Sequence, residues 1–162
     1  MRFRNPLKNR ESIWYTTVHI LAVLAAVIAV FPLLQANKFL VGPVVLGLGG
    51  MVLAMLWVSG RGPRTVAADM VYGAIDIGML SSVVSITAIF VGPVGAIFGT
   101  IIADAMTDAI AGMFEGQVAE WLRRRGIEES RTAMSAGLGK MAGGLLAAGV
   151  IVTIVGVLIG SW

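Results

Sequence analysis

The sequence predicts an all-α, polytopic integral membrane protein with about five transmembrane helices in a single membrane domain, residues 1–162. Of its residues, 57% are apolar and only 13% are charged, and the mean hydropathy is +0.90. A soluble domain carries charge on about a quarter of its residues. This composition excludes a disordered chain, a coiled coil and a nucleic-acid-binding module.

A bilayer-spanning helix needs about 20 mostly apolar residues, and five windows meet this condition: 13–34, 39–58, 66–90, 93–114 and 132–159. A basic segment precedes the first window, and a short polar connection, 35–38, leads into the second. The connection 59–65 contains Gly and Pro, which break helices. Gly92 and Pro93 predict a tight hairpin that makes the third and fourth helices antiparallel neighbours.

The connection between the fourth and fifth windows is longer and more polar. Residues 116–125 combine apolar and charged positions around Trp121, a pattern typical of an amphipathic helix at the level of the lipid headgroups. We therefore expect a short interfacial helix there. The fifth window is rich in glycine and contains one basic residue, Lys140.

The basic residues predict the orientation in the membrane. Ten of the twelve Lys and Arg residues fall at the N-terminus, in the connection 59–65 or in the connection after the fourth window, which an odd number of spans places on one side. Only Lys38 falls on the other side. The positive-inside rule then predicts a cytoplasmic N-terminus and an external C-terminus. We expect the bacterial inner membrane, because the basic N-terminal segment is too short for a transit peptide.

Acidic residues within the third and fourth windows carry the functional information. Asp69 and Asp76 are seven residues apart and share one helix face. Asp104 and Asp108 are four apart on the next helix, and Glu115 continues their stripe. Acidic side chains inside a membrane mark ion pathways by default.

The depth of these carboxylates suggests a site. With a rise of about 1.5 Å per residue, Asp76 and Asp104 both lie about 15 Å from the cytoplasmic side. Two carboxylates at one depth share a proton, bind a cation or pair with a base. Oxygen ligands suit Na⁺ or Ca²⁺, so we predict Asp76, Asp104, Asp108, Glu115 and Asp69 as metal ligands. Lys140 is the charge partner, expected near Asp104 or Asp108 when no ion is bound. The alternatives are that Lys140 reaches the interface and that the acids only join helices.

Other chemistry finds little support in the residues. There is no cysteine and one histidine, His19, which excludes thiolate sites and disfavours a His-containing catalytic triad. We therefore do not expect an enzyme. Glycine pairs at four-residue spacing permit close helix packing, within the chain or, for the fifth helix, across a homodimer.

Several segments between residues 70 and 160 resemble the transmembrane protein 65 family. Residues 99–104 (GTIIAD) and 111–115 (AGMFE) are similar to its Gly-Asn-x-x-Ser-Asp and Gly-Tyr-x-Glu signature. Arg131 with residues 138–143 (LGKMAG) resembles its Arg and Leu-Gly-Lys-x-x-Gly segment, and residues 74–79 (AIDIGM) resemble its Asp-Asn-Ala-Ile-Met stretch.

This resemblance implies a mitochondrial inner-membrane type of protein linked to sodium/calcium exchange. It singles out Asp76, Asp104, Glu115 and Lys140. The sequence departs from the family pattern at Ile77 and Thr100, where the family has Asn, and these changes remove two amide oxygens from the region of the acids.

Two functions follow as expectations. The first is a small cation transporter or exchanger of the Ca²⁺, Na⁺ or H⁺ class, embedded in the lipid bilayer, with Ca²⁺ or Na⁺ as the transported ion. The second is a non-catalytic accessory or assembly subunit of a larger membrane complex, in which the acids serve assembly. No nucleic-acid partner is expected for either.

Overall fold

The computed structural model describes residues 6–60, 62–126 and 133–159, and all regular elements in these ranges are helical. The long helices are α1 (Pro6–Ala36), α2 (Val41–Val58), α3 (Ala67–Val91), α4 (Pro93–Arg124) and α5 (Ala133–Ile159). Two short 3₁₀ helices, η1 (Lys38–Leu40) and η2 (Pro63–Val66), precede α2 and α3. Each long helix is long and apolar enough to cross a membrane, which confirms the predicted all-α polytopic membrane fold.

The predicted windows match these helices closely. Windows 39–58 and 66–90 overlie α2 and α3, whereas α1 begins before residue 13 and α4 continues past residue 114. Residue 132, predicted to start the fifth span, lies outside the described residues. The same holds for four of the basic residues used to predict orientation (Arg2, Arg4, Arg61 and Arg131).

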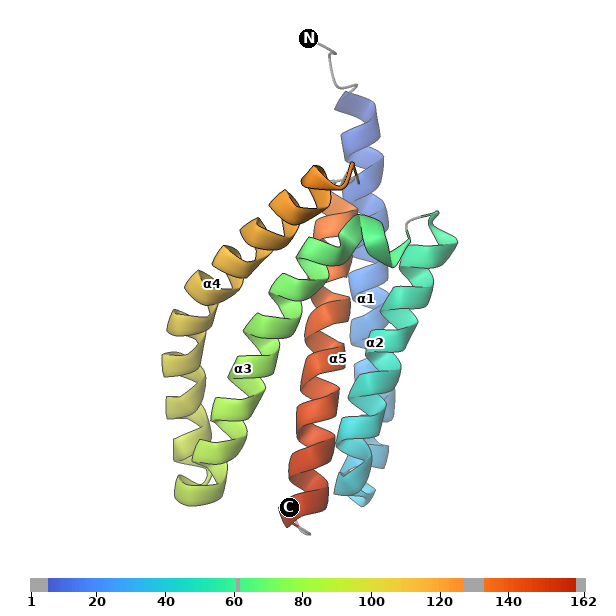
Figure 1. Cartoon of the computed structure of the whole chain (residues 1–162). Helices are drawn as coiled ribbons and strands as arrows, with labels where there is room; N and C mark the ends of the chain where they lie inside the picture. The colour runs from blue at the N-terminus through green and yellow to red at the C-terminus, as the bar shows by residue number, and fades with distance from the viewer. Residues whose placement is uncertain (1–5, 61, 127–132, 160–162) are drawn as a thin grey trace.

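Helix α5 lies at the centre of the arrangement, where it packs against α1, α2 and α3 (Figure 1). Among the described residues, the backbone of α4 lies close to that of α3 alone, so α4 forms one edge of the molecule. The start of α1, the α2–α3 connection and the end of α4 lie at the same end of the bundle (Figure 1). The alternating direction of the helices agrees with an odd number of spans.

The hairpin between α3 and α4 forms as predicted. Gly92 has φ 70°, a left-handed conformation that glycine adopts without steric cost. Its N–H donates to the carbonyl oxygen of Ala88 at 2.8 Å, which closes the end of α3. Pro93 is the first residue of α4, a position where a helix needs no N–H donor. This one-residue connection places α3 and α4 side by side along their length.

The amphipathic segment 116–125 is helical, but its residues up to Arg124 continue α4 rather than form a separate interfacial helix. Gly116, which stands between the predicted fourth span and the amphipathic segment, lies within a regular helix and does not interrupt it. The guanidinium of Arg125 stacks 3.9 Å from the ring centroid of Trp121. Arg124 pairs with Glu120 at 2.5 Å. These amphipathic pairs suit a helix end at the headgroup level.

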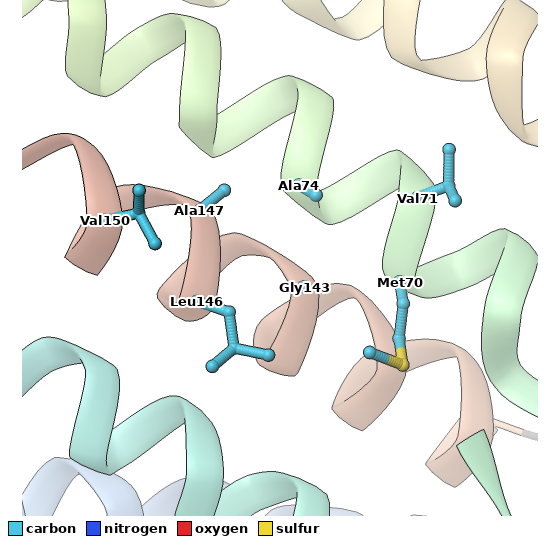
Figure 2. A pocket seen from close by; sticks show the side chains of 7 residues that line it. All are labelled: Met70, Val71, Ala74, Gly143, Leu146, Ala147 and Val150. Carbon is cyan, nitrogen blue, oxygen red and sulfur yellow. The ribbon is translucent and has the colours of Figure 1, made fainter.

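A groove of about 350 Å³ runs between α3 and α5 (Figure 2). Figure 2 shows that its lining side chains are small or apolar, and they come from those two helices only: Met70, Val71, Ala74, Gly143, Leu146, Ala147 and Val150. None of the acidic residues lines it. Its apolar lining suits hydrocarbon, and the acidic side chains of α3 and α4 lie outside it.

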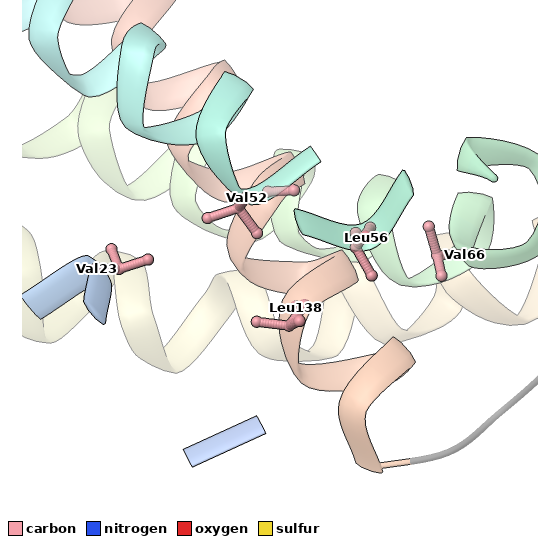
Figure 3. Close-up of a cluster of buried hydrophobic side chains, with 6 residues drawn as sticks. Val23, Val52, Leu56, Val66 and Leu138 are labelled. Carbon is pink, nitrogen blue, oxygen red and sulfur yellow. The ribbon is translucent and has the colours of Figure 1, made fainter. Parts of the chain in front are cut away.

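The hydrophobic core lies at the end of the bundle where α2 leads into α3 (Figure 3). It joins α1, α2, η2 and α5 through six buried side chains: Val23, Val52, Leu56, Val66, Leu138 and Ala142. Val52, Val66, Leu138 and Ala142 are fully buried. Because α5 contributes two of the six, the core fixes the start of α5 against the other helices.

Glycines of α5 allow this helix to pack closely against α2 and α3 of the same chain. A Cβ on Gly139 would lie 2.9 Å from the Cβ of Asp69 on α3, and one on Gly149 would meet Leu46 on α2. The close packing that these small residues allow therefore serves contacts inside one copy. A single copy does not test the homodimer predicted through this helix, and Gly160 lies outside the described residues.

Candidate functional site

The crossing of α3 and α5 is a contact between backbones. A Cβ added to Gly73 would collide with the carbonyl oxygen of Lys140, and one added to Gly143 would collide with that of Met70. Two glycines, one on each helix, therefore let the main chains touch. This crossing places Lys140 beside Tyr72, the neighbour of Gly73 in the sequence.

The ammonium group of Lys140 lies between an aromatic ring and a carboxylate. Its Nζ is 3.6 Å from the centroid of the Tyr72 ring and 3.4 Å from Oε2 of Glu115 on α4. The Glu115 side chain is 15% exposed and that of Lys140 38%. The prediction that Lys140 pairs with Asp104 or Asp108 is therefore wrong, because its partner is Glu115. The side chain extends toward the end of α4, where Glu115 lies.

Tyr72 links this ion pair to the next carboxylate. Its hydroxyl donates a hydrogen bond to Oδ1 of Asp108 at 2.6 Å. The sequence reasoning missed Tyr72, although a signal was present. It lies four residues before Asp76, and its hydroxyl is a hydrogen-bonding group in an otherwise apolar run. Tyr72 thus contacts groups from both neighbouring helices, Lys140 of α5 and Asp108 of α4.

Asp76 of α3 forms a second hydrogen bond between α3 and α4. The hydroxyl of Thr107 on α4 donates to its Oδ1 at 2.5 Å. Thr107 is almost fully buried, with 1% of its surface exposed. Asp76 lies about 14 Å along α3 from its first residue, counted at the helical rise per residue. The contact therefore holds an ionisable group between two spans, well inside the apolar part.

Asp69 lies on the α5 side of α3. It is 3% exposed, and its Cβ faces Gly139 of α5. Asp76, seven residues later, bonds to α4 instead. The two residues were predicted to share one face of α3, but Asp69 faces α5 and Asp76 faces α4. Asp69 therefore takes no part in the contact between Asp76 and Thr107.

Asp104 has the most unusual surroundings of the five acids. It is exposed, and it forms no hydrogen bond or ion pair within the part of the chain that the structure describes. Ile97 and Ile101, on the same side of α4, are 64% and 63% exposed. An acidic residue at the bilayer centre costs about 2.5–3.5 kcal/mol on insertion scales. One copy of the chain does not offset this cost.

Of the two threonine hydroxyl groups near these acids, one bonds to an acid and the other to the backbone of its own helix. Thr107 serves Asp76, whereas Thr100 donates to the carbonyl of Ala96 within its own helix at 2.9 Å. Among the described residues, no three side chains of the His, Cys, Asp or Glu type converge so that they could hold a metal ion. The predicted cation ligands are therefore dispersed: Asp76 and Asp108 take part in contacts between α3 and α4, Glu115 pairs with Lys140, Asp69 faces α5, and Asp104 is exposed. Their binding of an ion stays a prediction.

The arrangement as a whole is a line of polar contacts. From the end of α4 inward it runs through Glu115, Lys140, Tyr72 and Asp108, and the bond between Thr107 and Asp76 follows at one residue's distance along α4. Comparison of the chain with protein-family models, curated proteins and solved structures found no match.

Proposed function

We propose that this protein is a small integral membrane transporter or exchanger for cations of the Ca²⁺, Na⁺ or H⁺ class. The observation that carries the proposal is the hydrogen bond from Thr107 to Asp76, which seats a carboxylate between two membrane helices. A carboxylate is costly at this depth unless it is paired or functional. Among the described residues only Thr107 bonds to Asp76, so its second oxygen is available to a cation or a proton.

The neighbouring groups supply a route to this carboxylate. Asp108 and Glu115 lie on α4 between Thr107 and the end of the helix. Glu115 is held by the ammonium of Lys140, and Asp108 by the hydroxyl of Tyr72. An incoming cation competes with Lys140 for Glu115, so Lys140 serves as the resident counter-ion. The resemblance to the transmembrane protein 65 family points to the same class of function.

The proposal includes a location. The described basic residues Arg123, Arg124 and Arg125 end α4 at the same end of the bundle as the start of α1. By the positive-inside rule, this end faces the cytoplasm, and the membrane that we propose is a bacterial inner membrane. The line from Glu115 to Asp76 then opens on the cytoplasmic side.

The test is ion uptake by the purified protein in proteoliposomes. Ca²⁺ uptake is driven by a Na⁺ gradient and, in a separate experiment, by a proton gradient. We expect gradient-dependent uptake by the wild type and its loss in Asp76→Asn, which keeps the shape of the side chain but not its charge. The Thr107→Val variant retains the carboxylate and should transport at a reduced rate.

The matched control is Glu120→Gln. Glu120 is also an acid of α4, but it is exposed and pairs with Arg124 outside the proposed route, so this variant should transport as the wild type does. Absence of uptake of Ca²⁺, Na⁺ and protons by folded wild-type protein would refute the proposal. Equal losses in Asp76→Asn and Glu120→Gln would refute the assigned route.

A second candidate function, an accessory or assembly subunit of a larger membrane complex, is supported by the position of α4. Among the described residues its backbone lies close to α3 alone, which leaves a long exposed face in the membrane. Blue-native electrophoresis of tagged protein in mild detergent tests this function. A discrete complex far larger than a dimer supports it, and migration as monomer or dimer counts against it.

A further inference from the structure

The exposed face of α4 around Asp104 requires a partner with a particular chemistry. Asp104 lies eleven residues after Pro93, about 16 Å from the α3–α4 hairpin and thus near the middle of a hydrocarbon core about 30 Å thick. Ile97 and Ile101 flank it and are exposed. We define this surface, Ile97, Ile101 and Asp104, as the α4 face. In one copy it would present a carboxylate to lipid.

The part of the chain that the structure describes places no cation beside this carboxylate. Lys140 is the only Lys or Arg within the five predicted windows, and its ammonium is engaged by Glu115 and the Tyr72 ring. A second copy of the chain would bring another Asp104 and another engaged Lys140. Two carboxylates at one depth repel unless they share a proton, so charge complementarity favours a different occupant.

We propose that the α4 face binds a transmembrane helix of another protein that carries a lysine or arginine at the depth of Asp104. Ionisable groups inside membranes pair with one another, and the flexible stem of a basic side chain can reach a carboxylate across a helix contact. Ile97 and Ile101 supply apolar contact on the same face. This inference rests on the second candidate function and names the chemistry of the partner.

Asp108 provides the matched comparison. It lies one turn further along α4, is also exposed, and carries the same functional group. Its carboxylate, however, already accepts a hydrogen bond from the hydroxyl of Tyr72, with 2.6 Å between the two oxygens. If an unsatisfied charge determines binding, Asp104 should matter and Asp108 should not.

The experiment uses a synthetic transmembrane peptide as the probe. The peptide is a Leu/Ala helix of about 20 residues with a single lysine at its centre, and two matched peptides carry leucine there or the lysine near one end. The chain has no cysteine, so Phe90→Cys, an exposed position near the hairpin, gives a unique label. Energy transfer between the labelled protein and each peptide is measured in phosphatidylcholine vesicles, which carry no net charge.

We expect the central-lysine peptide to bind the wild type at least about tenfold more tightly than the leucine peptide, a modest free energy for a desolvated ion pair. Asp104→Asn should abolish this preference, whereas Asp104→Glu and Asp108→Asn should retain it. The end-lysine peptide should bind no better than the leucine peptide. A thermal melt of each variant verifies folding, and Asp104→Glu keeps the test valid should the Asn variant misfold.

Three outcomes would overturn the inference: equal binding of the lysine and leucine peptides, a preference that survives in Asp104→Asn, or self-association of two labelled copies that Asp104→Asn abolishes. The last would assign the face to a second copy of this chain. A large complex on native gels without a lysine preference would refute the partner chemistry but leave the subunit function standing. A lysine preference without any large complex would support the partner chemistry but refute the subunit function.

Discussion

The α carbon of Gly73 on α3 lies directly against the backbone carbonyl of Lys140 on α5, so close that a methyl group at residue 73 would collide with the carbonyl oxygen. This contact sets the distance between the two helices. It also places the ammonium of Lys140 3.6 Å from the ring centroid of Tyr72, the residue next to Gly73. The polar line of the candidate site therefore depends on a residue that carries no side chain.

Replacing Gly73 by alanine should destabilise the protein. The atom that the new methyl group would meet belongs to a backbone, which cannot move aside without shifting α5. We expect the free energy of unfolding to fall by about 1–3 kcal/mol, as for other overpacked sites, in unfolding from mixed detergent–SDS micelles. The control is Gly47→Ala on α2, where the added methyl group meets no atom within 4 Å. Equal stability of the two variants would show that the crossing is looser than described.

The hydrogen bond between Thr107 and Asp76 should contribute measurably to stability. Thr107→Val keeps the shape of the side chain and removes the donor, and we expect a loss of about 0.6–2 kcal/mol, the range for polar contacts between membrane helices. Thr100→Val is the control, because the Thr100 hydroxyl bonds only to Ala96 of its own helix. A double-mutant cycle with Asp76→Ala should show coupling, and additive effects would argue against the bond.

Two substitutions at Tyr72 separate its two contacts. Tyr72→Phe removes the hydroxyl that binds Asp108 and should cost about 0.6–2 kcal/mol in unfolding free energy. Tyr72→Leu also removes the ring beneath Lys140 and should cost about 0.5–2 kcal/mol more. In a Lys140→Met background the difference between the Phe and Leu variants should shrink. If it persists, the ring contributes by packing rather than through the cation.

The ion pair between Lys140 of α5 and Glu115 of α4 should be stronger than the surface pair of Glu120 and Arg124 within α4. Glu115 is only 15% exposed, so water screens it less than the pair of Glu120 and Arg124, whose side chains are 58% and 76% exposed. We expect a coupling of roughly 1 kcal/mol from the cycle Glu115→Gln with Lys140→Met, against about 0.3–0.5 kcal/mol for the exposed pair. Added salt should weaken the exposed pair more. Equal couplings would indicate that both pairs are equally solvated.

The positions of the polar groups along the chain follow from the sequence more directly than the partners of those groups do. The contact of Asp76 with α4 could be predicted, because the Gly92 hairpin makes α3 and α4 antiparallel neighbours. The same reasoning placed Asp104 beside Asp76, whereas the structure leaves Asp104 exposed. The partner of Lys140 could not be predicted, since a flexible lysine reaches several carboxylates and its choice depends on where the packed helices place each of them. Tyr72 was overlooked because one aromatic residue in an apolar span looks like packing until its neighbours are known.

The position of α4 at the edge of the bundle could not be predicted from the sequence either. All five spans are apolar on most of their surface, so hydropathy does not distinguish a central helix from a peripheral one. The structure places the glycine-rich α5 at the centre and α4 at the edge, which turns Asp104 from an expected inner ligand into an exposed group. Likewise, the amphipathic residues after 114 were predicted as helix, but only the structure shows them continuing α4 up to Arg124.

The sequence by itself determined that this chain is a helical membrane protein and which acidic residues lie within its spans. It could do so because insertion into a bilayer depends on local hydrophobicity and on segment length, both of which are written in consecutive residues. The tertiary structure decided which of those acids have a partner and that Asp104 has none among the described residues. Pairing depends on helix order and crossing distance, and these follow from contacts between residues as distant in the chain as Gly73 and Lys140.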